Sequence, residues 1–99
     1  MRSEYALVKI AYSDILYLET MDDYIRIHKT NNESVLTLSS MSKILKKLPE
    51  NDFCRVHRSY SVSLSKIDSV KNNKIMIGEY KIPVGTSYKD DFMKKYHLK

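Results

Sequence analysis

The residues best suited to chemistry lie in one short stretch, Phe53-Cys54-Arg55-Val56-His57-Arg58-Ser59-Tyr60. The stretch begins as a strand, because apolar Cys54 and Val56 alternate with basic residues, and successive side chains of a strand point to opposite faces. Arg58 breaks this alternation, since its guanidinium would fall on the apolar face, where a charge is rarely buried without a partner. The simplest geometry is two strands joined by a short connection at Arg58 and Ser59.

That connection gathers hydrogen-bond donors at one end of a sheet. Two arginines, a histidine and two hydroxyls suit phosphate oxygens and the acceptor edge of guanine. They are Arg55, His57, Arg58, Ser59 and Tyr60. An ordinary alternative stays open from these eight residues: Arg55 and His57 form a solvated strand face, and Arg58 pairs with a carboxylate.

Short strands dominate the first half of the chain. We expect a strand over residues 5–12, and a second over residues 15–18, which are apolar at every position as in a central strand covered on both faces. Residues 19–23 interrupt the pattern. Residues 24–28 then alternate, with Ile25 and Ile27 inward, and a turn rich in Asn leads to a partner strand over 35–38.

The spacing then changes to that of a helix. The apolar stripe at i, i+3, i+4 and i+7 consists of Met41, Ile44, Leu45 and Leu48. Ser39 or Ser40 can cap this helix, and Pro49 ends it. The outward lysines form either an ordinary solvated surface or a row that faces phosphates; they are Lys43, Lys46 and Lys47.

The second half predicts further hairpins and a final helix. Asn72-Asn73 and Gly78-Glu79 supply turns, and Pro83 indicates an edge strand or a strand end, because it lacks an amide hydrogen. Ser87 and Asp90 have the spacing of a capping box. The apolar stripe that follows is Tyr88, Phe92 and Tyr96. The whole pattern predicts a mainly β, antiparallel fold with one short central helix and a short C-terminal helix.

Composition limits the class of protein. A chain of 99 residues fits a single domain, 1–99, and no apolar run approaches the length of a membrane span, so we expect a cytoplasmic address. The single cysteine, Cys54, cannot form an internal disulfide and reads as a small buried hydrophobe. The net charge of +5 lies entirely in residues 51–99, with ten basic and five acidic residues, which points to a polyanionic partner.

Signals for an enzyme are weak. His28, His57 and His97 lie on different elements without metal-ligand spacing, and neither glycine belongs to a phosphate-binding loop, so we predict no metal and no cofactor. His57 beside Arg58 would suit an RNA-cleaving acid or base, but no second such group is placed. Basic residues, hydroxyls and aromatics instead gather in three loop regions, which are residues 20–24, 55–60 and 85–89.

Four ordered blocks carry a resemblance to a known family. They are Asp14-Ile15-Leu16-Tyr17-Leu18-Glu19 followed by Asp23-Tyr24-Ile25-Arg26-Ile27; Phe53-x-Arg55-Val56-His57-Arg58-Ser59-Tyr60-x-Val62; Ile67; and Ile82-Pro83-Val84-Gly85-x-Ser87-Tyr88. Over residues 5–96 the chain resembles the LytTR DNA-binding domain of bacterial response regulators. The resemblance implies an elongated, mainly antiparallel β fold that inserts loops into successive major grooves and binds imperfect direct repeats of double-stranded DNA as tandem or dimeric copies.

The resemblance nominates the same three loops as the charge pattern. We expect base contacts from Arg58 first, then His57 and Tyr24, and phosphate contacts from the residues Arg55, Ser59, Lys43 and Lys89. The loop around Asp23 and the turn of Thr86, Ser87 and Tyr88 complete the expected DNA-binding set.

Two departures from the family pattern stand out. Ser63 occupies the place of an expected asparagine, and Thr86 that of a commonly basic residue, which weakens the expectation of a DNA contact at Thr86. No receiver domain precedes these residues in the sequence, so we expect either the effector half of a regulator or a standalone regulator.

We predict no catalytic activity, no small-molecule substrate and no membrane partner. The alternative is a small RNA-binding or RNA-cleaving β module.

Overall fold

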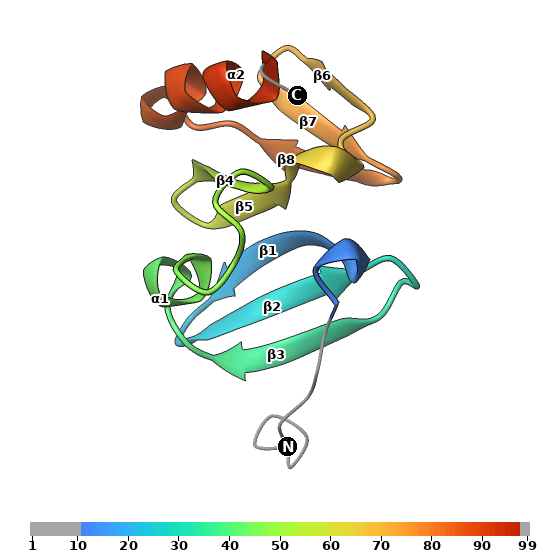
Figure 1. Ribbon diagram of the computed structural model, residues 1–99, viewed down its shortest axis with the longest axis vertical. Coiled ribbons are helices and arrows are strands. Elements are labelled where there is room, and N and C mark those ends of the chain that lie inside the picture. Colours follow the sequence, from blue (N-terminus) through green and yellow to red (C-terminus); the bar gives the residue numbers. More distant parts are fainter. Residues whose placement is uncertain (1–10, 98–99) are drawn as a thin grey trace.

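Two antiparallel sheets and two helices make up the computed structural model, which describes residues 11–97 (Figure 1). The first sheet has the strand order β3-β2-β1-β5-β4, and the second has the order β6-β7-β8. The strands are β1 Ile15–Met21, β2 Tyr24–Lys29, β3 Ser34–Leu38, β4 Phe53–His57, β5 Tyr60–Ser63, β6 Ser69–Lys71, β7 Lys74–Ile77 and β8 Tyr80–Pro83. The molecule is elongated, 39 × 25 × 21 Å, as expected from the family resemblance.

The helices are short. They are α1 Met41–Leu45 and α2 Lys89–His97, with 3-10 turns at Tyr12–Asp14, Leu64–Lys66 and Thr86–Tyr88. Ser40 caps α1, because its hydroxyl accepts a hydrogen bond from the Lys43 amide (3.3 Å), and this confirms one of the two expected caps. No helix among residues 11–97 has the length and apolar character that a membrane crossing requires.

The larger core lies between the two sheets and α2. Phe92 of α2 and Ile75 and Ile82 of the second sheet pack against Val56 and Val62 of the first. All five side chains are almost completely removed from solvent. Burial of this apolar surface holds the small second sheet and α2 in place beside the first sheet.

A second core lies between the first sheet and α1. Leu18 and Ile25 of the sheet contact Met41 of α1, and Phe53 closes the cluster. The sequence predicted Ile25 and Ile27 to point inward, and both are buried, as is Phe53. The all-apolar run at residues 15–18 is confirmed as part of a central strand, since β1 pairs with both β2 and β5.

The tight turns use the residues expected of them. Asn72 and Asn73 both have positive φ, 53° and 61°, as the two central positions of a hairpin turn demand. Gly78 and Asp22 have positive φ as well. Pro83 is the last residue of the edge strand β8, so its missing amide hydrogen breaks no ladder.

Two of the predicted segments in the first part of the chain have different boundaries in the structure. The strand predicted over residues 5–12 lies mostly outside the described residues, and Tyr12 begins a 3-10 turn. The predicted break at residues 19–23 is shorter, because β1 continues to Met21 through its pairing with β2.

The two helices also differ from their sequence patterns. α1 ends at Leu45, and Leu48 reaches the core from the irregular segment that follows. Ser87 lies inside the 3-10 turn that leads directly into α2. Among the described side chains it therefore forms no capping box with Asp90.

Candidate nucleic-acid interface

The turn between β4 and β5 is the centre of the candidate interface. Arg58 and Ser59 form this turn, as the sequence predicted. The pairing of β4 with β5 shifts between Arg55 and His57, so Val56 bulges out of the ladder. Bulges redirect nearby side chains and release main-chain groups. The freed carbonyl of Val56 accepts a hydrogen bond of 2.7 Å from the amide of Gly85, which ties the turn to the loop that follows β8.

Arg55 fixes the conformation of this turn. Its Nε donates to the carbonyl of His57 (3.3 Å), and its Nη2 donates to the carbonyl of Arg58 (2.6 Å). The amide of Ser59 donates to Nδ1 of His57 (3.1 Å). His57 therefore carries its hydrogen on Nε2 when neutral, which leaves that nitrogen as a donor.

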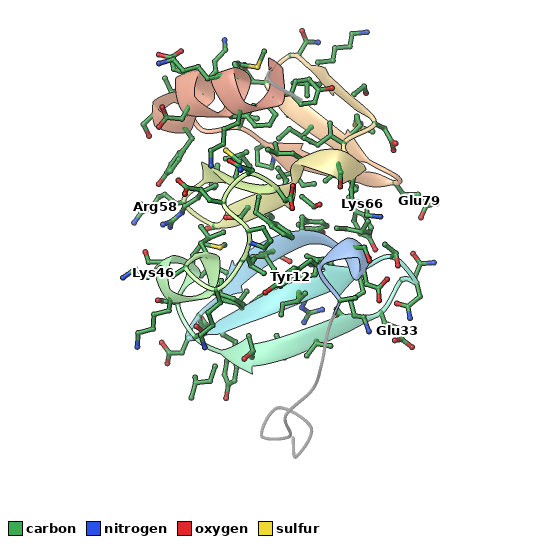
Figure 2. All side chains as sticks on the ribbon, in the orientation of Figure 1. Tyr12, Glu33, Lys46, Arg58, Lys66 and Glu79 are labelled. Atoms are coloured by element: carbon green, nitrogen blue, oxygen red, sulfur yellow. The ribbon has the colours of Figure 1, made fainter. Side chains whose placement is uncertain are left out.

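Arg58 extends from the turn into solvent (Figure 2). None of the ion pairs among residues 11–97 involves Arg58. The ordinary alternative, in which Arg58 pairs with a carboxylate, is therefore contradicted among these residues. A guanidinium at the tip of a braced turn, without an ion pair in the part of the chain that the structure describes, suits bidentate contact with an anion or a base edge.

A groove runs beside this turn, and we call it the Arg58 groove. It has a volume of about 810 Å³ and brings together the β1–β2 turn, the start of α1 and the β4–β5 turn. Its lining residues are Thr20, Asp22, Asp23, residues 38–43, Arg55, Arg58 and Ser59. In Figure 1 these three elements lie along the same side of the molecule. Segments separated by more than 30 residues thus form one surface.

The charges of the Arg58 groove are mixed. Lys43, Arg55 and Arg58 supply three cations, and Asp22 and Asp23 supply two carboxylates. Cations attract phosphates, whereas a carboxylate repels phosphate and can accept a hydrogen bond from an amino group such as that of cytosine. The groove therefore offers both kinds of group on one surface.

The third loop packs directly against the second. An added Cβ on Gly85 would lie 3.2 Å from Cδ2 of Tyr88 and 3.7 Å from Cδ2 of His57, so the backbone of this loop lies close against both rings. The guanidinium of Arg55 lies over the ring of Tyr88, 5.8 Å from its centroid. Cation–π attraction of this kind helps to hold Arg55 where it braces the turn.

Tyr60, the first residue after the β4–β5 turn, belongs to a network of aromatic rings around the Glu19 carboxylate. Tyr60 donates to Oε2 of Glu19 (3.4 Å), and Nε2 of His28 lies 3.0 Å from Oε1 of the same carboxylate. Burial, followed by the Glu19 charge and hydrogen bond, raises the pKa of Tyr60. Burial also raises the pKa of Tyr17, which stacks on His28 at 4.1 Å, to about 12. Both phenols therefore stay protonated at neutral pH.

The predicted contact residues fall into three groups. Five of them line the Arg58 groove: Asp23, Lys43, Arg55, Arg58 and Ser59. His57 and Tyr88 are half-buried beside it, and Thr86, Ser87 and Lys89 are exposed on the adjoining third loop and at the start of α2. Tyr24 is half-buried, lies on the opposite face of β2 from Ile25, and is not among the residues that line the groove.

Three serines of the groove were not predicted as DNA contacts, namely Ser39, Ser40 and Ser42. Their closeness in sequence to Lys43 is a signal that could have found them. Thr20 also lines the groove and belongs to the predicted loop region of residues 20–24. Thr20 Oγ1 is buried and has no hydrogen-bond partner among the described residues.

Cys54 lies in the interior of the domain. The Cys54 thiol is buried, which raises its pKa, and Sγ donates to the carbonyl of Arg55 (3.5 Å). Across the described part of the chain, no three His, Cys, Asp or Glu side chains are grouped so that they could bind a metal.

Comparison with known proteins identifies the family. The sequence model of the LytTr DNA-binding domain family matches residues 5–97 of this chain. The chain is 33% identical over 99 residues to the sensory transduction protein LytT of Bacillus subtilis, covering 94% of this chain and 41% of LytT. It is 29% identical over 93 residues to the transcriptional regulatory protein YpdB of Escherichia coli K12, covering 87% of this chain and 38% of YpdB.

A solved structure has the same fold. The LytTr DNA-binding domain of a putative methyl-accepting/DNA response regulator from Bacillus cereus superposes with a TM-score of 0.79 at 22% identity, over 89% of this chain and 85% of that one. The chain spans about two-fifths of the length of the curated relatives LytT and YpdB. The sequence match over nearly the whole chain, together with this fold, shows that the chain belongs to the LytTR family of DNA-binding domains.

Proposed function

We propose that this domain reads specific sequences of duplex DNA by inserting its three loops into the major groove, with Arg58 as the principal base contact. His57 adds a donor beside it, and Asp23 accepts from bases within the Arg58 groove. Lys43, Arg55, Ser59 and Lys89 hold phosphates, together with hydroxyls of the third loop. Phosphate contacts set affinity and register, whereas the few base contacts set sequence preference.

One observation carries the proposal: the Arg58 side chain is exposed and makes no ion pair among residues 11–97, while its main chain is held by Arg55. Because Arg55 already holds the main chain of the turn, only the Arg58 side chain has to be ordered when its guanidinium meets a guanine edge. Tyr24 does not itself line the Arg58 groove, and we assign it a contact with DNA next to the groove.

We further propose that the domain is the effector part of a bacterial two-component response regulator that acts on transcription in the cytoplasm. Its operators would be imperfect direct repeats bound by tandem copies. LytT and YpdB are named as a sensory transduction protein and a transcriptional regulatory protein, and both are longer than this chain. We assign the domain no catalytic step.

Arg58→Ala tests the proposal. A preferred duplex is first selected from a random pool with the unaltered chain, and affinities are then measured for that duplex and for a random one at several salt concentrations. We expect Arg58→Ala to cost about 1–3 kcal/mol on the selected duplex and to relax the preference at one or two base pairs. Lys43→Ala serves as the matched control, and should weaken both duplexes alike and reduce the salt slope. Equal losses on the two duplexes for Arg58→Ala would reject its role as a reader.

A further inference from the structure

The outer face of the second sheet carries a cluster of lysines that the three loops do not include. Lys71 of β6 lies directly opposite Lys74 of β7, and Met76 of β7 lies opposite Lys81 of β8. These side chains point away from Ile75 and Ile82, which are buried in the larger core. Lys71, Lys74 and Lys81 line one shallow hollow with Ser69, Asn72 and Met76. We call the three lysines, Lys71, Lys74 and Lys81, the lysine face.

Among the described residues, no acidic side chain pairs with the lysine face. No carboxylate lines the hollow, and none of its three ammonium groups forms an ion pair within the described part of the chain. Like charges directly opposite each other on neighbouring strands are destabilising, and Lys81 is a diagonal neighbour of Lys74. An anion bound in the hollow would relieve this repulsion.

The lysine face adjoins the third loop. Lys74 pairs with Pro83, the residue at which β8 ends and the chain turns towards Gly85. The amide of Val84 donates to the carbonyl of Asn73 (2.9 Å), so the β6–β7 turn is joined to the segment that enters the third loop. Figure 1 shows the same continuity from β8 towards the start of α2. Lys71 and Lys74 therefore lie at the end of the sheet nearest the candidate interface.

We propose that the lysine face binds backbone phosphates of the duplex DNA that flanks the segment contacted by the three loops. Lysine is a flexible point charge that suits phosphate contacts and carries no base-specific geometry. Duplex DNA that continues past the third loop presents a row of phosphates where this face begins. The inference rests on the proposed function, and it assigns the face a role in affinity and none in sequence preference.

The test compares two lengths of the selected duplex. The short one contains only the sequence required by the loops, and the long one adds about one helical turn of arbitrary sequence on each side. Binding is measured over a range of salt concentrations for the unaltered chain and for the triple variant Lys71→Gln, Lys74→Gln and Lys81→Gln. On the long duplex we expect the triple variant to lose roughly two to three units of the slope of log K against log salt, since each neutralised phosphate contributes about 0.9.

Three controls accompany the triple variant. On the short duplex, its affinity and sequence preference should equal those of the unaltered chain. Arginines at the same three positions keep the charge and should keep the slope on the long duplex. Lys29→Gln removes a charge at the opposite end of β2 from the loops and should leave both slopes unchanged. The melting temperature of the triple variant should be no lower, because opposing charges are removed.

If the triple variant binds the long duplex with the same salt slope as the unaltered chain, the inference is overturned. The lysine face would then suit an acidic protein surface instead. Loss of preference for the selected duplex in the triple variant would also overturn it, since the face would then take part in reading. Failure of the proposed function would give a different result, because the unaltered chain would not distinguish selected from random DNA. In that case the salt slope of the triple variant can still be measured on long random DNA.

Discussion

Nη2 of Arg55 donates a hydrogen bond of 2.6 Å to the main-chain carbonyl of Arg58, so one arginine of the β4–β5 hairpin shapes the turn that displays the other. The same side chain donates to the carbonyl of His57 and lies over the ring of Tyr88. Arg55 therefore links the second and third loops, and we propose that its contribution to DNA binding goes beyond its charge.

Replacement of Arg55 by lysine should separate these two contributions. An ammonium group retains the charge but cannot reproduce the two-nitrogen fork that spans both carbonyls. We expect Arg55→Lys to lose about 1 kcal/mol of affinity for a selected duplex and to bind a random duplex almost as well as the unaltered chain. Anisotropy titrations of the two duplexes measure this difference. Equal affinities of Arg55→Lys and the unaltered chain for the selected duplex would show that charge alone matters.

Gly85 should tolerate only a small side chain. Its φ of −72° is ordinary for any residue, so the limit comes from space. A Cβ would lie 3.2 Å from the ring of Tyr88, which must then shift by a few tenths of an ångström. We expect Gly85→Ala to cost under about 1 kcal/mol and Gly85→Val about 1–3 kcal/mol, because overpacking forces larger shifts. Urea denaturation measures both, and a Gly85→Val variant as stable as the unaltered chain would contradict this packing.

The β6–β7 turn provides a test of backbone conformation. Asn73 has a φ of 61°, which glycine adopts freely and a β-branched residue does not. We expect Asn73→Gly to change the free energy of unfolding by less than about 0.5 kcal/mol, and Asn73→Val to lower it by about 1–2 kcal/mol. Thermal or chemical denaturation checks the order of the three proteins. Equal stability of the valine and glycine variants would mean that the turn has a different conformation.

Tyr17 should make stability fall at high pH. Burial raises its pKa in the folded state from 10.0 to about 12. Between these values the unfolded chain loses the phenolic proton while the folded chain keeps it, so ionisation favours unfolding and stability decreases as the pH rises. Below pH 10 the contribution is fully present. The Tyr17→Phe variant keeps the ring stacked on His28 and removes the ionisation.

The measurement for Tyr17 is the free energy of unfolding between pH 8 and pH 12. Deprotonation of the lysines affects both proteins, so the difference between them isolates the phenol. The loss with rising pH should be smaller for Tyr17→Phe. Parallel profiles for the two proteins would contradict a raised pKa for Tyr17 in the folded state.

Several features could be predicted from the sequence because they depend on neighbouring residues. The Arg58-Ser59 connection, the Asn72-Asn73 turn and the cap at Ser40 each follow from local backbone preference or from interrupted alternation. The boundaries were predicted less well. β1 extends to Met21 because β2 pairs with it, and α1 stops at Leu45 although the apolar stripe continues to Leu48.

The sequence by itself determined a mainly β chain with a basic second half and three loops rich in donors, since alternation, turn residues and charge are properties of short segments. Only the tertiary structure decided that β1 lies beside β5, which brings Asp23 into one groove with Lys43 and Arg58. It also placed together on the second sheet three lysines that form no ion pair among residues 11–97. Such arrangements depend on strand order and register, which are set by packing between residues distant in the chain, and no local pattern encodes them.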